Sequence, residues 1–422
     1  MNIKNDNIKK SSSWSWVPSL YFIEGLPYTL VISLSVIMYK KLDISNTDIA
    51  FYTGWLYFPW VIKPLWSPFV DLLKNKRWWI VSMQFVMGIC MAGVAFTVPT
   101  NFFFQSTLAF FWLAAFSSAT HDIAADGFYM LGLNKERQAF FIGIRNTAYR
   151  LATIFGQGLL VIIAGYIEKE NGGIAFSWTI AFIISAIVLI IGAIYHKFIL
   201  PHPTSDVTRT DISAQSVLQG FADTYSSFFS KKGIGLAIFF ILTYRLAESQ
   251  LVKLASPFLL DKRIDGGMEL STESIGFIYG TLGACMLIAG GILGGIAISK
   301  GGLKKWIFPM ALSLNLPDLA YLFLAYYSPE SIYVTAGCVA LEQFGYGFGF
   351  TAYTMFLMLF SEGKYNTSHY AFCTGLMAAG MMLPGMASGW IQDHIGYQLF
   401  FVWVMICTIP GLIATLLVKK KL

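Results

Sequence analysis

The sequence predicts an all-α integral membrane protein with twelve transmembrane helices in two six-helix halves. Hydrophobic residues fill 56% of the 422 positions and charged residues only 12%, whereas a soluble domain carries roughly 25% charged residues. The apolar residues form segments of about 20 residues, the length that crosses the hydrocarbon layer of a bilayer. Short sequence matches also recur between the two halves of the chain. This much apolar surface has to face lipid.

Twelve segments are long and apolar enough to be transmembrane helices. They are 15–39, 48–70, 78–98, 104–131, 138–166, 175–199, 233–260, 273–299, 304–327, 331–360, 366–391 and 396–418. A polar, lysine-bearing stretch precedes the first of them, without the short apolar segment and small-residue cleavage site of a signal peptide. We therefore expect the first segment to remain as a helix.

Lys and Arg are distributed unequally over the connecting segments. If the N-terminus is cytoplasmic, the inside segments hold nineteen of them: Lys4, Lys9, Lys10, Lys74, Lys76, Arg77, Lys135, Arg137, Lys197, Arg209, Lys231, Lys232, Lys300, Lys304, Lys305, Lys364, Lys419, Lys420 and Lys421. The outside loops hold five: Lys40, Lys41, Lys169, Lys262 and Arg263. Cytoplasmic loops carry such an excess, so both termini are predicted to be cytoplasmic. This asymmetry accounts for the net charge of +6 without a nucleic-acid partner.

The longest break between apolar segments is 201–232, and it divides the chain into a first half, 1–200, and a second half, 233–422. Apolar residues recur in this break at helical spacing: Ile212, Val217, Leu218, Phe221 and Phe228. The pattern predicts a linker with an amphipathic helix on the cytoplasmic surface. A plain loop is the alternative.

The two halves repeat weakly in sequence. Thr47–Gly54 reads TDIAFYTG and Glu273–Gly280 reads ESIGFIYG, an offset of 226 residues. Gly165–Ile167 reads GYI and Gly389–Ile391 reads GWI, an offset of 224 residues. Two matches at nearly the same offset, on equivalent helices, indicate a parallel repeat of six plus six helices. That arrangement resembles the major facilitator superfamily fold.

A small set of ionisable residues lies inside the predicted spans. They are Glu24, Lys63, His121, Asp122, Asp126, Arg145, Arg150, Arg245, Glu248, Lys253, Asp318 and Glu342. A charge at a helix centre costs about 2.5–3.5 kcal/mol on insertion scales, so such residues usually face an internal cavity and pair there. We expect the same here.

Asp122 and Asp126 are four residues apart and share one helix face. Equal distances from the turn at 132–137 place them level with Arg145 and Arg150. Repulsion between the acids favours protonation and a nearby Arg opposes it, so these groups can exchange a proton as the cavity opens. The alternative is that both acids stay ionised and join two helices. His121 is a second proton-active group or a helix–helix hydrogen bonder.

The first helix carries Glu24 next to Gly25 and Pro27, which predicts a kink beside a charge. Such a broken helix lines a transport site or is an ordinary kink in which Glu24 pairs with a residue such as Lys63.

In the second half, Arg245 and Glu248 are three residues apart and can pair within one helix. Lys253 lies further towards the outside, and Glu342 and Asp318 are single acids of other helices.

No pattern in the sequence indicates an enzyme or a resident cofactor. The five cysteines fall in apolar segments without C-x-x-C spacing. His121 has no His or Cys partner at the spacing of a zinc site, and no phosphate-binding loop occurs. We therefore expect no metal and no cofactor, with the proton as the coupling ion.

Six stretches resemble, in order, the AmpG muropeptide permeases. They are EGLPYTL, KPLWSPFVD, HDIAADGFY, AYRLATIFGQG, TYRLAE and LEQFGYGFGFTAY. The resemblance implies a proton-driven importer of GlcNAc-anhydroMurNAc peptides, working by alternating access in a bacterial inner membrane for peptidoglycan recycling. The D-I-x-x-D-G element is also similar to eukaryotic acetyl-coenzyme A transporters. A carrier for another anion, such as an acyl-coenzyme A, is therefore the alternative.

Carried over from this resemblance, Asp122 and Asp126 match the D-I-x-x-D acids, Arg150 the arginine of Y-R-L, Lys63 the lysine of K-x-L-W-S-P and Glu342 the acid of the tenth helix. The chain departs from the family at His121, where Gln is usual, and at Glu24, where a small uncharged residue is usual. It is also shorter than members with additional helices between the halves.

The expected site has two parts. Its proton-coupling residues are Asp122, Asp126, His121 and Glu24. Its substrate-binding residues are Arg145, Arg150, Arg245, Lys253, Lys63, Glu342, Glu248, Tyr149, Tyr244 and Trp55. The basic residues suit the carboxylates of a sugar–peptide, the aromatic residues suit its sugar rings, and we expect a monomer in the bilayer.

Overall fold

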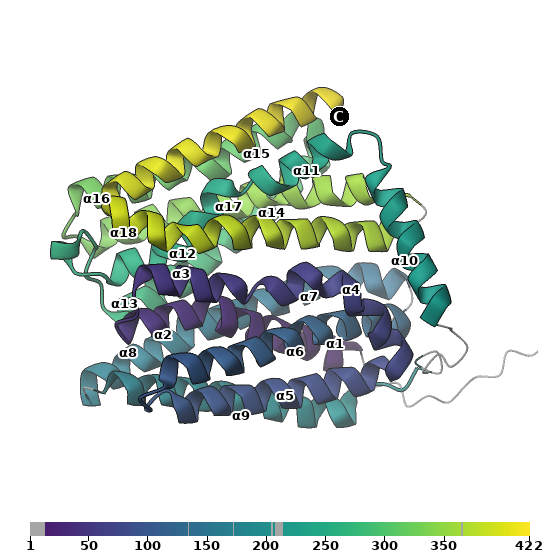
Figure 1. Ribbon diagram of the computed structural model, residues 1–422, viewed down its shortest axis with the longest axis horizontal. Helices are drawn as coiled ribbons and strands as arrows, with labels where there is room; N and C mark the ends of the chain where they lie inside the picture. The colour runs from purple at the N-terminus through teal and green to yellow at the C-terminus, as the bar shows by residue number, and fades with distance from the viewer. Residues whose placement is uncertain (1–12, 134, 172, 204–205, 207–213, 364–365) are drawn as a thin grey trace, which may run out of the picture.

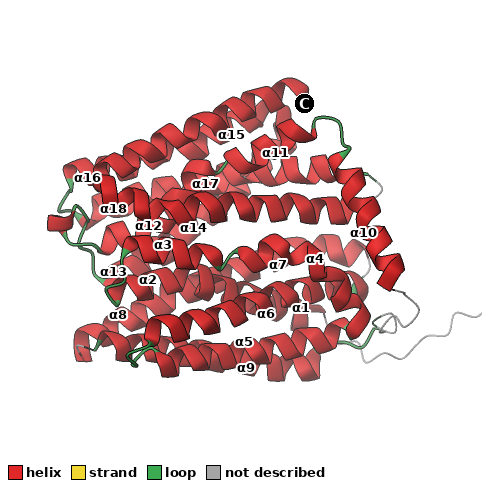
Figure 2. Cartoon of the chain, viewed as in Figure 1, coloured by secondary structure: helices red, strands yellow, loops and turns green. Residues whose placement is uncertain are grey.

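The computed structural model describes residues 13–133, 135–171, 173–203, 206, 214–363 and 366–422. Helices and loops make up these residues, and no strand occurs among them (Figure 2). The first half comprises α1 (Ser13–Thr29), η1 (Leu30–Leu34), α2 (Ser35–Lys41), α3 (Asn46–Trp55), α4 (Phe58–Leu73), α5 (Lys76–Thr97), α6 (Phe103–Gly132), α7 (Lys135–Thr153), η2 (Ile154–Leu159), α8 (Leu160–Asn171) and α9 (Ile174–Ile199).

Helix α10 (Ala214–Phe229) connects the halves. It lies within the segment predicted to contain an amphipathic helix, and Ile212 lies outside the described residues. The second half comprises α11 (Ile234–Thr243), α12 (Leu246–Leu260), η3 (Arg263–Asp265), α13 (Thr272–Ile275), η4 (Gly276–Gly283), α14 (Ala284–Gly301), α15 (Leu303–Asn315), η5 (Leu316–Asp318), α16 (Leu319–Tyr327), α17 (Ile332–Ser361) and α18 (Asn366–Lys421).

Over the described ranges these elements form the twelve predicted spans, and the all-α fold with two six-helix halves is confirmed. Eight of the described helical stretches are long and apolar enough to cross a membrane, and the last of them, 369–421, contains two spans. Gly396 separates those two spans because its φ of 74° is not helical.

Several spans are broken where the sequence weakens a helix. Pro27 lies inside α1, and the π-helical turn η1 follows within three residues. Proline removes a backbone hydrogen bond, and π-turns are frequent at functional sites. Pro317 lies in the short 3-10 turn that separates α15 from α16. At the position of the predicted kink after Glu24, the structure has a change of helix type.

The two halves lie side by side, with the first half purple to teal and the second half teal-green to yellow in Figure 1. Helix α10 and the C-terminus lie at one end of the molecule, which we call the linker end. The α2–α3 connection, α8 and α13 lie at the other end, which we call the far end (Figure 1).

The segments that repeat in sequence meet across the two halves at the far end. Helix α3 packs on α18, and α8 packs on α13. A Cβ atom on Gly389 would lie 2.0 Å from the backbone oxygen of Asn46, and one on Gly165 would lie 2.4 Å from the backbone nitrogen of Glu273. Only glycine allows backbones to approach this closely. The recurring glycines are therefore the contact points between the halves.

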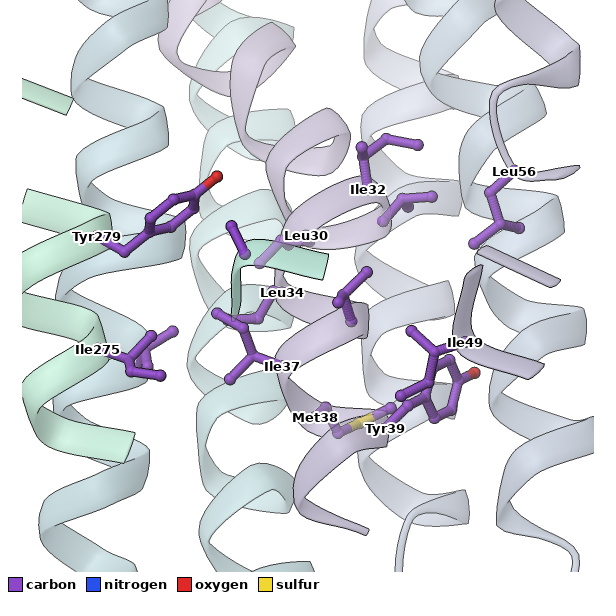
Figure 3. Packing of buried hydrophobic residues seen from close by; sticks show 14 of the residues in the cluster. Leu30, Ile32, Leu34, Ile37, Met38, Tyr39, Ile49, Leu56, Ile275 and Tyr279 are labelled. Carbon is purple, nitrogen blue, oxygen red and sulfur yellow. The ribbon is translucent and has the colours of Figure 1, made fainter. Parts of the chain in front are cut away.

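One buried apolar cluster continues from the first half into the second. Leu30, Leu34 and Ile37 belong to the same cluster as Ile275 and Tyr279 (Figure 3). The side chains of this cluster are excluded from solvent at the far end. Apolar packing and close glycine contacts together hold the halves against each other there.

Replacing Gly389 by Ala is expected to disfavour this closed arrangement. The added methyl group overpacks the contact with Asn46, and overpacking costs roughly 1–3 kcal/mol. A reporter cysteine at Ile49, a buried position of α3, should then react about tenfold faster with a thiol reagent in a background without the native cysteines. Gly337→Ala is the matched control, because nothing lies within 4 Å of its Cβ position. Equal labelling rates in the two variants would contradict the assignment.

Candidate functional site

A cavity of about 470 Å³ lies between the two halves. Its inner part is lined by Tyr28 of α1 and Arg245, which precedes α12. From there it extends to Lys76, at the start of α5, and Tyr370, near the start of α18. The cavity therefore runs from the middle of the protein towards the linker end.

Two further cavities adjoin this one. The larger, about 710 Å³, lies between α7 on one side and α14 and α17 on the other, and it shares Tyr370 with the first. The smaller, about 140 Å³, is lined by Tyr149, Arg150, Arg245 and Tyr346. Together the three cavities form a large space for a ligand between elements of both halves.

The far end is closed by polar contacts between the halves. Lys40 Nζ lies 2.6 Å from Asp261 Oδ1, and Thr272 Oγ1 donates a hydrogen bond to Glu168 at 3.0 Å. Asn46 Nδ2 donates to Gln392 Oε1 at 2.7 Å. These contacts and the apolar cluster close the far end in this conformation.

Asp122 and Asp126 each face a cation of the first half. Trp60 Nε1 donates to Asp122 Oδ2 at 3.0 Å, and Lys63 Nζ lies 3.6 Å from the same oxygen. Arg145 Nη2 lies 2.9 Å from Asp126 Oδ1. The acids predicted from the four-residue spacing therefore lie on a surface that faces α4 and α7. The charge of Arg145 is directed to an acid of the same half.

Glu24 lies beside Asp122 and forms no ion pair with a cation of the described residues. One oxygen of Glu24, one oxygen of Asp122 and one ring nitrogen of His121 lie within 4.8 Å of one another. Glu24 is buried, and its Oε2 atom has no hydrogen-bond partner in the described part of the chain. Two carboxylate oxygens and a ring nitrogen at this spacing can bind a metal ion. The positive charge near Asp122 is, however, already supplied by the ammonium group of Lys63. We assign no metal to the cluster.

His121 contacts a buried Gln84, which in turn contacts His196, and neither residue was predicted from the sequence. Gln84 of α5 contacts one ring nitrogen of His121 at 2.9 Å and contacts His196 of α9 at 2.9 Å. All three side chains are fully buried. A single glutamine within the apolar stretch IVSMQFVMG was the available signal for Gln84. Trp60, the hydrogen-bond donor to Asp122, was also missed.

Arg150 and Arg245 come from opposite halves and line the same inner cavity. Arg245 donates to the hydroxyl of Tyr346, and its guanidinium carbon lies 4.9 Å from the centre of the Phe350 ring. Among the described residues neither arginine forms an ion pair with an acid. The helix breaks at Arg245, so the alternative of an Arg245–Glu248 pair within one helix is not what the structure contains.

Lys253, Tyr244 and Trp55 are placed away from the three cavities. Lys253 is buried and donates to Thr53 Oγ1 of the first half at 2.8 Å. The hydroxyl of Tyr244 donates to the backbone oxygen of Gly349 at 2.9 Å. Trp55 is partly exposed at the end of α3, where its ring meets Phe58. Tyr149, in contrast, lines two cavities.

The acids of the second half are also buried outside the described cavities. Glu248, Asp318 and Glu342 are each excluded from solvent. Gln343 donates to Glu342 at 3.0 Å, whereas no hydrogen-bond partner occurs among the described residues for the carboxylates of Glu248 and Asp318. The structure thus brings Glu24, Lys63, His121, Asp122, Asp126 and Arg145 together, and it leaves Glu248 and Glu342 apart from them.

Two related helical halves around a shared polar cavity are the architecture of a secondary transporter. A family model described as Major Facilitator Superfamily matches residues 19–362. The chain therefore belongs to the Major Facilitator Superfamily, and it is a membrane transporter rather than an enzyme.

The resemblance to AmpG permeases is confirmed by curated relatives. The chain is 25% identical over 414 residues to the anhydromuropeptide permease of Escherichia coli (strain K12), covering 96% of this chain and 79% of that one. It is 26% identical over 374 residues to the putative transporter AmpG 1 of Rickettsia bellii (strain RML369-C), covering 86% of this chain and 88% of that one.

Solved structures share the fold. A D-xylose-proton symporter superimposes with a TM-score of 0.72 at 12% identity, over 96% of each chain. A bacterial homolog of the human lysosomal transporter Spinster superimposes with a TM-score of 0.70 at 14% identity, over 98% of each chain. At these identities the likeness shows the fold alone.

A double-mutant cycle on Arg145 and Asp126 tests whether their contact stabilises the first half. Because both side chains are partly exposed, the coupling free energy should be about 0.5–1 kcal/mol. It is measured from thermal unfolding of wild type, Arg145→Gln, Asp126→Asn and the double variant in detergent. Strictly additive effects of the two substitutions would show that the contact contributes nothing.

Proposed function

We propose that this transporter is a proton-coupled importer of anhydromuropeptides across the bacterial inner membrane for peptidoglycan recycling. The observation that carries the proposal is the pair Arg150 and Arg245, one from each half, at the inner cavity without an acid partner among the described residues. Guanidinium groups bind carboxylates in a bidentate manner, and muropeptides carry carboxylates. The names of the curated relatives support the same substrate class.

A ligand that binds between these two arginines couples its own binding to the movement of the two halves. Neutralising one guanidinium group from each half removes the repulsion between them and lets both halves approach the ligand. Tyr28 and Tyr149 line the same cavity and offer rings for sugar stacking. The three joined cavities suit an extended molecule such as a sugar–peptide better than a single small anion.

The coupling ion is a proton held by the acids of the first half. Glu24, Asp122 and Asp126 are three carboxyl groups, and Lys63 and Arg145 are the two cations that contact them. An acid buried without a counter-ion is stable as the neutral form, so the cluster retains one proton while it is shielded. Water entering from either end of the cavity stabilises the charged form and lets that proton leave.

In this proposal both termini are cytoplasmic, as the Lys and Arg distribution predicts. The linker end then faces the cytoplasm, and the closed far end faces the periplasm. The conformation described here is the inward-facing one, ready to release cargo. Each monomer contains a complete cavity and works alone.

Replacing either arginine by Gln is expected to lower uptake of labelled anhydromuropeptide into proteoliposomes at least tenfold, because a charged hydrogen bond contributes about 1.5–3 kcal/mol. Arg263→Gln is the matched control, since Arg263 is exposed and contacts Ser328 in a loop. Unchanged uptake in Arg150→Gln and Arg245→Gln would overturn the anion site. Thermal stabilisation by coenzyme A thioesters and not by muropeptides would favour an acyl-coenzyme A carrier instead.

Replacing Glu24 by Gln is expected to abolish accumulation against a gradient and to preserve exchange of labelled for unlabelled substrate. The amide imitates the protonated acid, so the carrier can still change conformation with substrate bound. Both rates are measured in the same vesicles with and without an imposed pH gradient, and Glu362→Gln in an exposed loop is the control. Wild-type accumulation by Glu24→Gln would show that another group carries the proton.

A further inference from the structure

We propose that Gln84 is a positioning residue for the proton site. Its side-chain amide holds the imidazole of His121 with the Nδ1 hydrogen directed to the carboxyl groups of Glu24 and Asp122, and His196 holds Gln84 in turn. This inference rests on the proposed proton-coupled transport, and it names the residues that orient the proton-binding groups.

Four helices contribute to this arrangement. Gln84 Nε2 of α5 lies 2.9 Å from Nε2 of His121 of α6. His196 Nδ1 of α9 lies 2.9 Å from Gln84 Oε1, and Ser19 Oγ of α1 lies 3.0 Å from His196 Nε2. Gln84, His121 and His196 have no exposed surface. Water therefore does not compete for these hydrogen bonds.

The chemistry of an amide determines where the ring hydrogens lie. An amide nitrogen only donates and an amide oxygen only accepts. Gln84 Nε2 donates to His121 Nε2, so the hydrogen of a neutral His121 ring is on Nδ1. At the other end, His196 donates its Nδ1 hydrogen to Gln84 Oε1 and accepts the hydroxyl hydrogen of Ser19 at Nε2.

The ring of His121 has one nitrogen within 4.8 Å of an oxygen of Glu24 and an oxygen of Asp122. Its Nδ1 atom has no hydrogen-bond partner among the described residues, while Nε2 is engaged by Gln84. The charged groups around the ring are Glu24 from α1, Lys63 from α4 and Asp122 from the same helix. The remaining titratable neighbour is His196, behind Gln84.

A fixed Nδ1 hydrogen changes what the acids can do. It offers a neutral donor to the carboxylate that forms when Glu24 or Asp122 loses its proton, and so it favours release. The other tautomer would offer a lone pair, which would retain the hydrogen of the neutral acid. Gln84 thereby selects the tautomer of His121 that supports proton exchange, without adding a charge to the site.

Gln84→Met keeps the side-chain length and removes both hydrogen bonds. We expect proton-driven accumulation of anhydromuropeptide to fall about tenfold, while substrate exchange without a pH gradient stays within twofold of wild type. Gln250→Met is the matched control, because Gln250 is equally buried and accepts a hydrogen bond from Trp403 in the second half. Equal accumulation by Gln84→Met and Gln250→Met would overturn the proposal.

A second measurement does not depend on transport or on the folding of Gln84→Met. Nitrogen NMR of the wild-type protein with labelled histidine, with the His121 signal identified by its loss in His121→Gln, reports which ring nitrogen carries hydrogen. The proposal predicts a neutral His121 with hydrogen on Nδ1 alone, and hydrogen on Nε2 or a mixture of both would overturn it. If the wild type moves no muropeptide but shows this tautomer, the proposed substrate has failed and the positioning role has not.

Discussion

The cluster around Glu24 in the first half contains more carboxyl groups than cations, and this imbalance of charge determines how the site can bind a proton. Three carboxyl groups meet two cations in a space that is closed at one end. Glu24, which forms no ion pair within the described ranges, is also the least exposed of the three acids. Burying an unpaired carboxylate is far more costly than burying a carboxylic acid. In the proposed mechanism the cluster therefore keeps a proton while the site is shielded and releases it when water enters.

The rest of the fold determines when the site is shielded. The far end is closed by backbone contacts at glycines, by the apolar cluster, and by the Lys40–Asp261 ion pair and hydrogen bonds between the halves. Such contacts can separate as rigid surfaces, since little side-chain interdigitation has to be undone at Gly165 and Gly389. The acids of the second half lie apart from the cavities, whereas both halves contribute an arginine to the inner cavity. In the proposed mechanism only the first half holds the exchangeable proton.

Much of this arrangement could be predicted from the sequence because it depends on spacing along single helices. The four-residue separation of Asp122 and Asp126, and their distance from the turn before Arg145, are properties of one helical hairpin. The structure places Arg145 in contact with Asp126, whereas Asp122 contacts Lys63 and Trp60 of another helix. The repeated GYI and GWI segments predicted the two halves, although the sequence did not reveal that each contacts the opposite half. Gln84 and His196 could not be found in this way, because the contacts of Gln84 with His121 and with His196 depend on how three separate helices pack. The same holds for Glu248 and Glu342, whose polar character suggested the cavity but whose helices turn them into the interior.

The number of protons transported with each substrate molecule is the direct test of proton coupling through the buried cluster. In proteoliposomes with the membrane potential held at zero, the substrate gradient at which net flux vanishes can be measured over a series of imposed pH gradients. One exchangeable proton in the buried cluster predicts that each tenfold proton gradient balances a tenfold gradient of substrate. A zero-flux point that does not move with the pH gradient would contradict the account.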